Sequence, residues 1–234
     1  MFYRLTKLQG YPIDAVDGTI GSVEDVYFDA ERWGVRYFVV RSGDWLRERD
    51  VLISPRALRP GARSGDAIAT SLTREQVEKS PPVATGHPIS RHYEMAHAAH
   101  YRDDFHWNDP PSRAGGSFGM LLGTAQLQPG NEVSQLEAIA EREIEAAERS
   151  HLRSGAEVIA YDIEATDGTI GTVEDFLIDD EDWRVSYLLV DKRNWVGSGH
   201  VLIPVEAVDR IDWGVGLVRL TMTRDEAARS AGYP

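Results

Sequence analysis

Histidine is the residue type in this chain best suited to binding a metal ion, and five of the seven histidines lie between residues 87 and 106. Residues 90–101 have the pattern of a helix with Ser90 as its N-cap, which places His97 and His100 on one face. Two imidazoles at this spacing can reach one ion, and nearby carboxylates can complete its shell. The candidate metal ligands are His92, His97 and His100, with Glu94, Asp103 or Asp104 beside them.

The same segment fits an alternative reading without a metal. Tyr93, His97, His100 and Tyr101 form an aromatic, half-polar stripe at helical spacing. Such stripes commonly pack against neighbouring structure, with the imidazoles hydrogen-bonded at the edge. The chain has no tight ligand signature such as HExxH. The sequence therefore favours packing and predicts no cofactor, with metal binding kept as the alternative.

A second set of reactive side chains is acidic and occurs twice. Glu24 and Asp25 return as Glu174 and Asp175, and acidic turns follow at residues 29–33 and 179–183. Hard cations need six or more converging oxygens, and neither turn has the ligand spacing of an EF-hand. Adjacent residues of a strand point to opposite faces, so each acidic pair shares no site unless a bulge intervenes. We interpret the acidic turns as turns in which Asp caps the backbone.

Other signatures of catalysis are missing from the sequence. It contains no G-x-S-x-G elbow, P-loop or dinucleotide fingerprint. It also contains no cysteine, which excludes disulfides, thiolate metal sites and Cys nucleophiles. We therefore expect a protein that is not an enzyme.

Charge and hydropathy limit the classes of partner and the location that the sequence allows. The formal net charge of -13 argues against a broad nucleic-acid surface, because phosphate binding needs clustered Lys and Arg. No apolar run approaches the roughly 20 residues of a membrane helix, and residues 1–13 lack the apolar core of a secretory signal. The expectation is a cytoplasmic protein with no integral membrane segment.

The acidic pairs belong to a repeated phrase. DGTIGSVEDVYFD at residues 17–29 returns as DGTIGTVEDFLID at residues 167–179, and an offset of 150 maps one segment onto the other. The same offset pairs Trp33 with Trp183 and Trp45 with Trp195. A period this long indicates two tandem domains, not a solenoid of short repeats.

Each copy has the pattern of a mainly β domain. Asp17-Gly18 and Asp167-Gly168 suggest tight hairpin turns made by a pair of residues with positive φ. The apolar positions Ile20, Val23, Val26 and Phe28 are spaced irregularly, which predicts bulges that bend a strand around a small barrel. Each copy ends in a short helix with a capping box, Thr73 with Gln76 and Thr223 with Glu226.

These motifs resemble the PRC-barrel family, named after the H subunit of the photosynthetic reaction centre. The resemblance rests on the DG-x-IG-x-VED phrase and covers both copies, and the chain looks like stand-alone tandem PRC-barrel proteins of bacteria. The same barrel forms the C-terminal half of a ribosome maturation factor. The reaction-centre subunit has an N-terminal membrane helix and the ribosome factor a separate N-terminal domain, neither of which is found here. The resemblance therefore implies the fold and a habit of docking proteins.

The resulting prediction is two small PRC-type β-barrels joined by a partly helical, partly irregular connector. The domains are residues 1–80 and 151–234, and the connector of residues 81–150 contains the histidine segment, a Gly/Pro loop and an amphipathic helix from about Ser134.

The expected function is a non-catalytic interaction or scaffold module, which also docks at membrane-associated complexes. The alternatives are metal or small-ligand binding by the connector and an accessory role in ribosome assembly. A homodimer is a further arrangement that the sequence leaves open. Large aromatic residues are typical contacts in protein interfaces. The candidate partner-binding residues are Trp33, Trp45, Trp183, Trp195 and Phe118.

Overall fold

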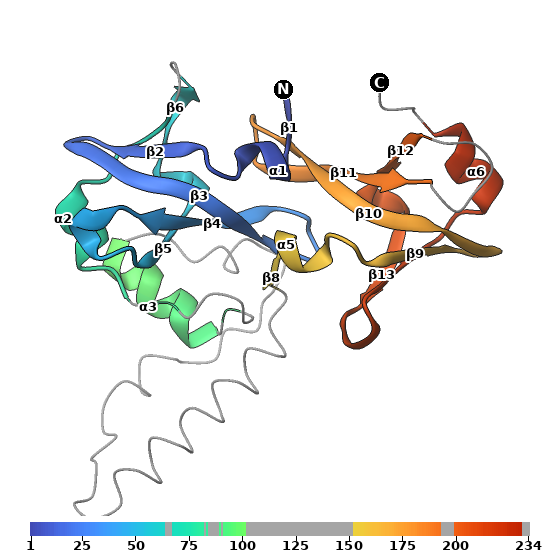
Figure 1. The fold of residues 1–234 in the computed structure, drawn as a ribbon. Helices are drawn as coiled ribbons and strands as arrows, with labels where there is room; N and C mark the ends of the chain where they lie inside the picture. Colours follow the sequence, from blue (N-terminus) through green and yellow to red (C-terminus); the bar gives the residue numbers. More distant parts are fainter. Residues whose placement is uncertain are drawn as a thin grey trace, which may run out of the picture. The chain divides into compact units, whose positions relative to one another are not determined.

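The computed structural model of the protein describes residues 1–63, 67–81, 83, 89, 91–101, 152–192 and 199–230. The chain divides into two compact units, and Figure 1 draws the described elements as ribbons. The first contains both repeats, Met1–Gly86 and His151–Pro234, and the second is His87–Ser150. The domain boundaries predicted at residues 80 and 150 stay a prediction.

The first repeat forms most of one seven-stranded sheet, with strand order β5-β4-β3-β2-β7-β6. Antiparallel hairpins join its consecutive strands β2 to β5, and β2 pairs with β7 in parallel. Its elements are β2 (Pro12–Ala15), β3 (Gly18–Asp29), β4 (Val35–Ser42), η1 (Asp44–Leu46), β5 (Asp50–Ile53), η2 (Pro55–Ala57), β6 (Leu58–Arg63), β7 (Ile68–Thr70) and α2 (Arg74–Glu78).

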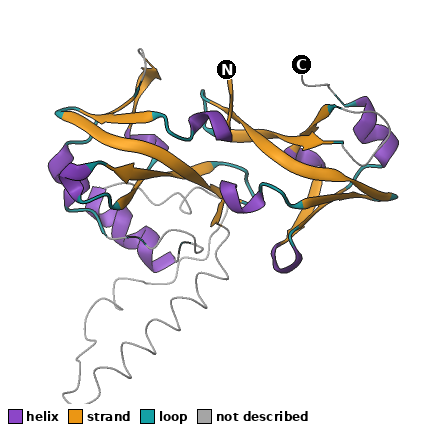
Figure 2. Cartoon of the chain, viewed as in Figure 1, coloured by secondary structure: helices purple, strands orange, loops and turns teal. Residues whose placement is uncertain are grey.

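The second repeat builds the other sheet with the equivalent order, β12-β11-β10-β9-β14-β13. Figure 2 shows the strands of both repeats in orange. The predicted mainly β fold is therefore confirmed, with one seven-stranded sheet for each of the two predicted barrels. Within the described residues, the two end strands of each order do not pair, so hydrogen bonds do not close either sheet. The elements of the second repeat are β9 (Asp162–Ala165), β10 (Gly168–Asp179), β11 (Arg184–Asp191), β12 (His200–Pro204), η4 (Val205–Ala207), β13 (Val208–Asp212), η5 (Trp213–Val215), β14 (Leu217–Leu220) and α6 (Arg224–Arg229).

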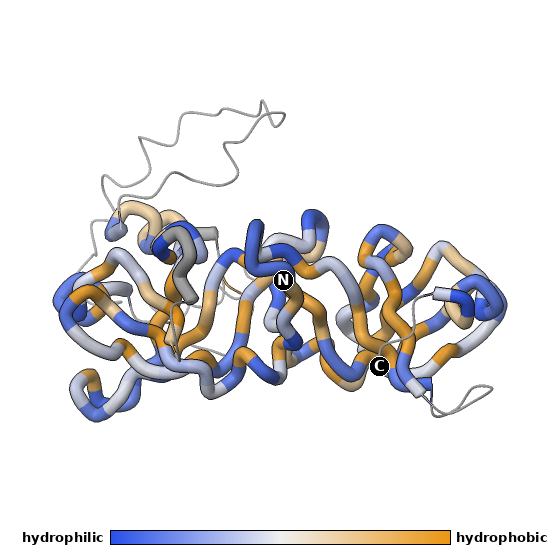
Figure 3. Tube along the Cα trace, turned by 90° about the horizontal axis from the view of Figure 1, so that it is seen from above, coloured by the Kyte–Doolittle hydropathy of each residue, from blue (hydrophilic) through white to orange (hydrophobic). Residues whose placement is uncertain are grey.

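The long central strands carry the predicted bulges. The register of β3 against β4 shifts between Val23 and Asp25, and that of β10 against β11 shifts between Val173 and Asp175. The irregular spacing of apolar residues is explained by this shift, because Ile20, Val23 and Val26 all remain buried. Figure 3 shows hydrophobic and hydrophilic stretches interspersed along the described trace.

The glycines of the repeated phrase have two separate tasks. At Gly21, a Cβ atom would lie 1.9 Å from the carbonyl oxygen of Arg41, so only glycine permits this close approach of β3 to β4. Gly18 has a φ of 145°, which L side chains rarely adopt. The prediction of a pair of positive-φ residues in this turn was wrong, because Asp17 is not among the residues with positive φ. Its carboxylate instead accepts a hydrogen bond from the backbone N–H of Arg74, at 2.8 Å.

The two repeats exchange their first strands. β1 (Phe2–Arg4) pairs with β10 of the second sheet, and β8 (Leu152–Ser154) pairs with β3 of the first. In Figure 1 the dark blue β1 lies beside the orange β10. Each exchanged strand runs directly into a short helix, α1 (Leu5–Leu8) or α5 (Gly155–Val158). Each sheet therefore consists of six strands from its own repeat and one from the other, which the sequence analysis did not predict.

Backbone hydrogen bonds and aromatic rings complete the seam between the sheets. The carbonyl of Trp33 accepts from the N–H of Val185 at 2.8 Å, and the carbonyl of Trp183 accepts from the N–H of Val35 at 2.7 Å. Both tryptophans have left-handed backbones, with φ of 59° and 54°. Phe28 and Phe176 meet with ring centroids 5.5 Å apart. The two sheets are therefore joined by the pairing of the exchanged strands, by further backbone hydrogen bonds and by packing of buried aromatic rings.

The second unit contributes one described helix, α3 (Arg91–Tyr101), which confirms the helix predicted there. The predicted Gly/Pro loop, the amphipathic helix from Ser134 and the N-cap Ser90 lie outside the described residues. Among the helices of the described residues, none has the length and apolar character to cross a membrane.

Candidate functional site

The aspartates of the repeated phrase bond to the exchanged segments. The Asp25 carboxylate accepts hydrogen bonds from Ser154 Oγ at 2.5 Å and from the backbone N–H of Ala156 at 2.9 Å. The fully buried Asp175 accepts from the backbone N–H of Thr6 at 3.2 Å and from the Thr6 hydroxyl. Each aspartate thus binds the first turn of the short helix that arrives from the other repeat.

The environment of Asp25 changes its acidity. Burial raises the pKa of Asp25, although the hydrogen bonds from Ser154, Val26 and Ala156 act in the opposite direction. The cause is therefore mainly desolvation. The folded protein consequently holds a proton on this carboxyl more tightly than the unfolded chain does.

In the second repeat the bulge brings the neighbouring acids Glu174 and Asp175 to one cation. Arg4 of β1 donates from Nε to Asp175 at 2.8 Å and from a terminal nitrogen to Glu174 at 2.9 Å. Adjacent strand residues share a partner here because the register shift falls between Val173 and Asp175. The two carboxylates thus form an ion-pair cluster that joins the two repeats.

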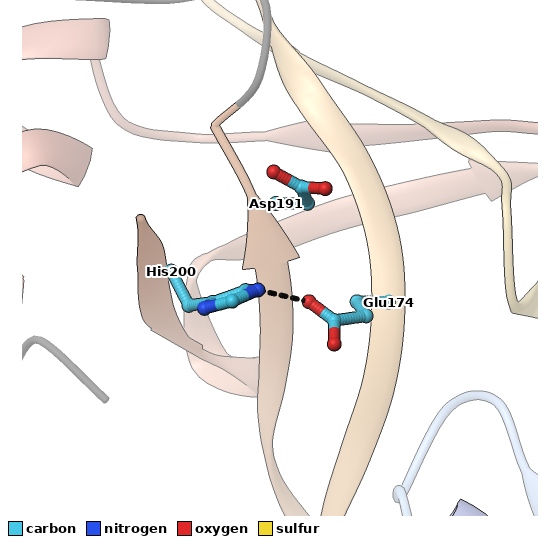
Figure 4. Close-up of side chains that lie close together, drawn as sticks. All are labelled: Glu174, Asp191 and His200. Atoms are coloured by element: carbon cyan, nitrogen blue, oxygen red, sulfur yellow. Dashed lines mark ion pairs between the residues drawn. The ribbon is translucent and has the colours of Figure 1, made fainter. Parts of the chain in front are cut away.

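Glu174 also takes part in a group that we call the Glu174 trio, made of Glu174, Asp191 and His200 (Figure 4). The three residues lie on the adjacent strands β10, β11 and β12. Their nearest metal-ligating atoms all lie within 4.8 Å of one another. Nε2 of His200 is 2.5 Å from Oε2 of Glu174. Among the described residues, these three side chains form the group whose ligand types and mutual distances could hold a metal ion.

The structure places the predicted partner-binding tryptophans in different settings. Trp33 is 8% exposed and stacks on Phe28 with a 5.4 Å centroid distance. Trp183 is half-buried and meets Phe38 of the first repeat edge-on at 4.9 Å. These two residues hold the seam, which leaves Trp33 little surface for a partner.

Among the predicted partner-binding tryptophans that the structure describes, Trp45 lies away from the seam. It is half-buried, donates from Nε1 to the carbonyl of Ile20 at 2.9 Å, and has the Arg74 guanidinium 4.2 Å from its ring centroid. Trp195 and Phe118 lie outside the described residues. Partner binding by this whole set stays a prediction.

The connector histidines are placed on α3 as expected. His97 is 2% exposed and lies near the rings of Tyr93 and Tyr101, with centroid distances of 6.2 and 4.7 Å. His100 meets Tyr101 edge-on. The predicted aromatic stripe therefore exists, whereas the side chain of His92 lies outside the described part of the structure. Metal binding by His92, His97 and His100 stays a prediction.

Two open grooves lie on the described surface. One of about 600 Å³ on the first sheet is lined by polar and small residues that include Glu24, Arg41 and Glu48. The other, of about 350 Å³ on the second sheet, contains Glu164, Asp209 and Arg219. In the second groove the arginines are ion-paired, Arg219 with Glu164 and Arg210 with Asp209, as is common on a protein surface.

Comparison with known sequences identifies the repeat. The profile of the PRC-barrel domain matches residues 1–69 and again residues 152–221. The chain belongs to the PRC-barrel domain family. Each matched PRC-barrel segment begins with its exchanged strand, β1 or β8, so the sequence unit and the spatial unit differ by one strand. A search of the curated proteins gave no match.

Sequence reasoning missed Arg4, Ser154, Asp191 and His200. The first two lie before the repeated phrase, where the copies differ, and their roles depend on strand exchange. The last two did have a signal. At the offset of 150, Arg41 becomes Asp191 and Asp50 becomes His200, so the charge pattern of the paired strands changes between the PRC-barrel domains.

Proposed function

We propose that this protein is a non-catalytic interaction module whose joined PRC-barrel domains dock a protein partner. The observation that carries the proposal is the use made of the repeated acids. Asp25 and Asp175 bond to the opposite domain, and Glu174 shares Arg4 with Asp175. Polar residues that recur in both domains thus serve assembly of the two sheets, which supports a scaffold.

The exchanged strands give such a scaffold a rigid surface. Because each sheet includes a strand from the other repeat, separating the domains would break both β1–β10 and β8–β3 pairings. Surfaces that do not rearrange lose less free energy to ordering when a partner binds. Two domains fixed in this way present one composite surface instead of two independent ones.

Exposed side chains indicate where contact is made. The large apolar residues most exposed among the described ones lie at the N-terminus, in the turn after β2 and in η5. These residues are Met1, Phe2, Val16 and Val215. With a net charge of -13, the module suits a partner with a basic surface, which electrostatic attraction would steer toward it. We place that partner in the cytoplasm, including at membrane-associated complexes.

Site-specific photocrosslinking tests this function. A photoreactive residue is introduced at Phe2, Trp45, Trp195 or Val215 in the producing cell, and at the exposed Lys79 as the matched control. The expected result is one crosslinked protein shared by several test positions and absent at Lys79. That protein, once purified, should bind saturably and more weakly as salt is raised. Binding that never saturates, or crosslinks equal to those of the control, would count against the proposal.

A further inference from the structure

The Glu174 trio is positioned by the register of three strands. Asp191 on β11 and His200 on β12 are direct cross-strand partners, so their side chains project from the same face of the sheet. Thr172 on β10 faces Asp191 on the other side, and Glu174 follows two residues later at the bulge. The three side chains therefore converge from neighbouring strands whose hydrogen bonds hold them in place.

The equivalent positions of the first repeat have different chemistry. There Glu24 stands where Glu174 does, while Arg41 and Asp50 replace Asp191 and His200. Arg41 and Asp50 form an ion pair with a 2.5 Å separation. The first repeat thus contains its own cation at this place, whereas the second has two carboxylates and an imidazole.

The two carboxylate oxygens of Glu174 have different surroundings. Oε1 accepts from Arg4, which itself is held by Asp175. Oε2 is buried and makes no aligned hydrogen bond, even though Nε2 of His200 lies 2.5 Å away. A carboxylate oriented by one oxygen, with the other directed at an imidazole, has the form of a metal ligand supported by an outer residue.

Charge favours a divalent ion. Arg4 supplies one positive charge against the two carboxylates that it binds, Glu174 and Asp175, so this acidic pair keeps about one negative charge. Asp191 is 7% exposed, whereas the His200 side chain is 42% exposed. The site is therefore partly shielded, which strengthens its attraction for a cation, and it opens to solvent on the histidine side.

We propose that Glu174, Asp191 and His200 bind a divalent transition-metal ion, for which zinc is the best match. Imidazole nitrogen with carboxylate oxygen is a usual donor set for zinc, while calcium and magnesium prefer oxygen alone. Zinc holds such ligands at about 2.0–2.2 Å, so ligand atoms can be no more than about 4.4 Å apart. The ligand atoms of the trio lie within 4.8 Å of one another, so a shift of a few tenths of an ångström brings them within this limit. Three protein ligands leave a fourth position for water or for a ligand from another molecule.

Calorimetric titration of the untagged, metal-stripped protein with zinc chloride tests the site. The matched variant carries both Asp191→Arg and His200→Asp, which recreates the Arg41–Asp50 pair that the fold already accepts in the first repeat. The expected result is one zinc ion bound by this site in the original protein and at least tenfold weaker binding in the double variant. Calcium and magnesium should bind far more weakly than zinc.

Two further variants keep the outcome unambiguous. His200→Gln changes a single exposed strand end, so its loss of zinc binding would not reflect misfolding, which circular dichroism of the metal-free protein checks. A variant with His97→Asn and His100→Asn should bind zinc at the trio as before. The proposal is overturned if the original protein binds no zinc. It is equally overturned if the double variant binds as tightly as the original, or if only the connector variant loses the ion.

Discussion

Leu5 and Gly155 occupy equivalent places in the two repeats and lie against each other at the seam. A Cβ atom built on Gly155 would come within 2.6 Å of Cδ2 of Leu5, and within 3.1 Å of a methyl group of Val26. The large side chain of one repeat therefore fills the space that its counterpart leaves empty. A side chain on both would not fit, so the seam requires two copies that differ at this position.

Replacing Gly155 with alanine should destabilise the protein. The added methyl group has no space beside the fully buried Leu5, and overpacking of this kind costs about 1–3 kcal/mol. Urea unfolding followed by circular dichroism measures the free-energy difference. Gly214→Ala is the matched control, since a Cβ atom there meets nothing within 4 Å. Equal effects of the two changes would contradict the packing argument.

The raised pKa of Asp25 predicts a specific pH dependence. Burial makes the folded protein bind this proton more tightly than the unfolded chain, so the free energy of unfolding decreases as pH rises from the ordinary aspartate range through the raised pKa. Asp25→Asn removes the titration. Relative to that variant, the original protein should therefore lose stability as pH rises above the ordinary pKa of an aspartate.

Asp29 provides the control with opposite sign. Burial alone raises its pKa, but the hydrogen bonds from Arg36, Arg32 and Glu31 outweigh burial and leave the pKa lowered. The original protein should therefore gain stability relative to Asp29→Asn as pH rises through the acidic range. Unfolding curves at several pH values check both variants. Slopes of the same sign would show that the two carboxyls do not differ as described.

Removing the Asp175 carboxylate should weaken the joint between the repeats. Asp175→Ala deletes the acceptor for Arg4 and Thr6 in a fully buried place, and hydrogen bonds with charged groups contribute about 1.5–3 kcal/mol. We expect a loss of stability near the top of that range. Thr223→Ala, which removes the cap of α6 away from the seam, should cost about 1 kcal/mol. Chemical unfolding compares the two, and a smaller effect for Asp175 would refute its role.

The separated repeats should differ in how they associate. Each fragment has a sheet without its seventh strand and a first strand without its sheet, so exchange between two identical fragments is the available solution. In residues 151–234, Gly155 would face another glycine, whereas in residues 1–80 Leu5 would face a second leucine. We therefore expect the second repeat to dimerise more tightly, as measured by sedimentation equilibrium. A well-folded monomer of either repeat would contradict this.

Local features of the fold were predictable from the sequence, because each depends on residues close together in the chain. The bulge in β3 follows from the spacing of Ile20, Val23 and Val26, and the capping boxes follow from Thr73 with Gln76 and Thr223 with Glu226. The acidic turns also behave as predicted, since Asp29 accepts hydrogen bonds from the N–H groups of Glu31 and Arg32.

Strand exchange was not predictable in the same way. Because the repeats are alike, β1 satisfies the same hydrogen-bonding pattern on β10 as it would on β3, and the sequence does not distinguish the two pairings. The distinguishing contact is between Leu5 and Gly155, 150 positions apart in sequence. The Glu174 trio was missed for a related reason. Asp191 and His200 meet only through strand register, and neither belongs to the repeated phrase.

The exchanged first strands make the order of biosynthesis important. While the chain is being translated, the whole first repeat emerges before β8 and β10 exist, so β3 and β1 both lack their native partner strands. The native pairings of both exchanged strands can form only after the second repeat has left the ribosome. A chaperone that covers unpaired β-strand edges during translation would act in this interval. The rate at which the connector is translated sets the length of the interval.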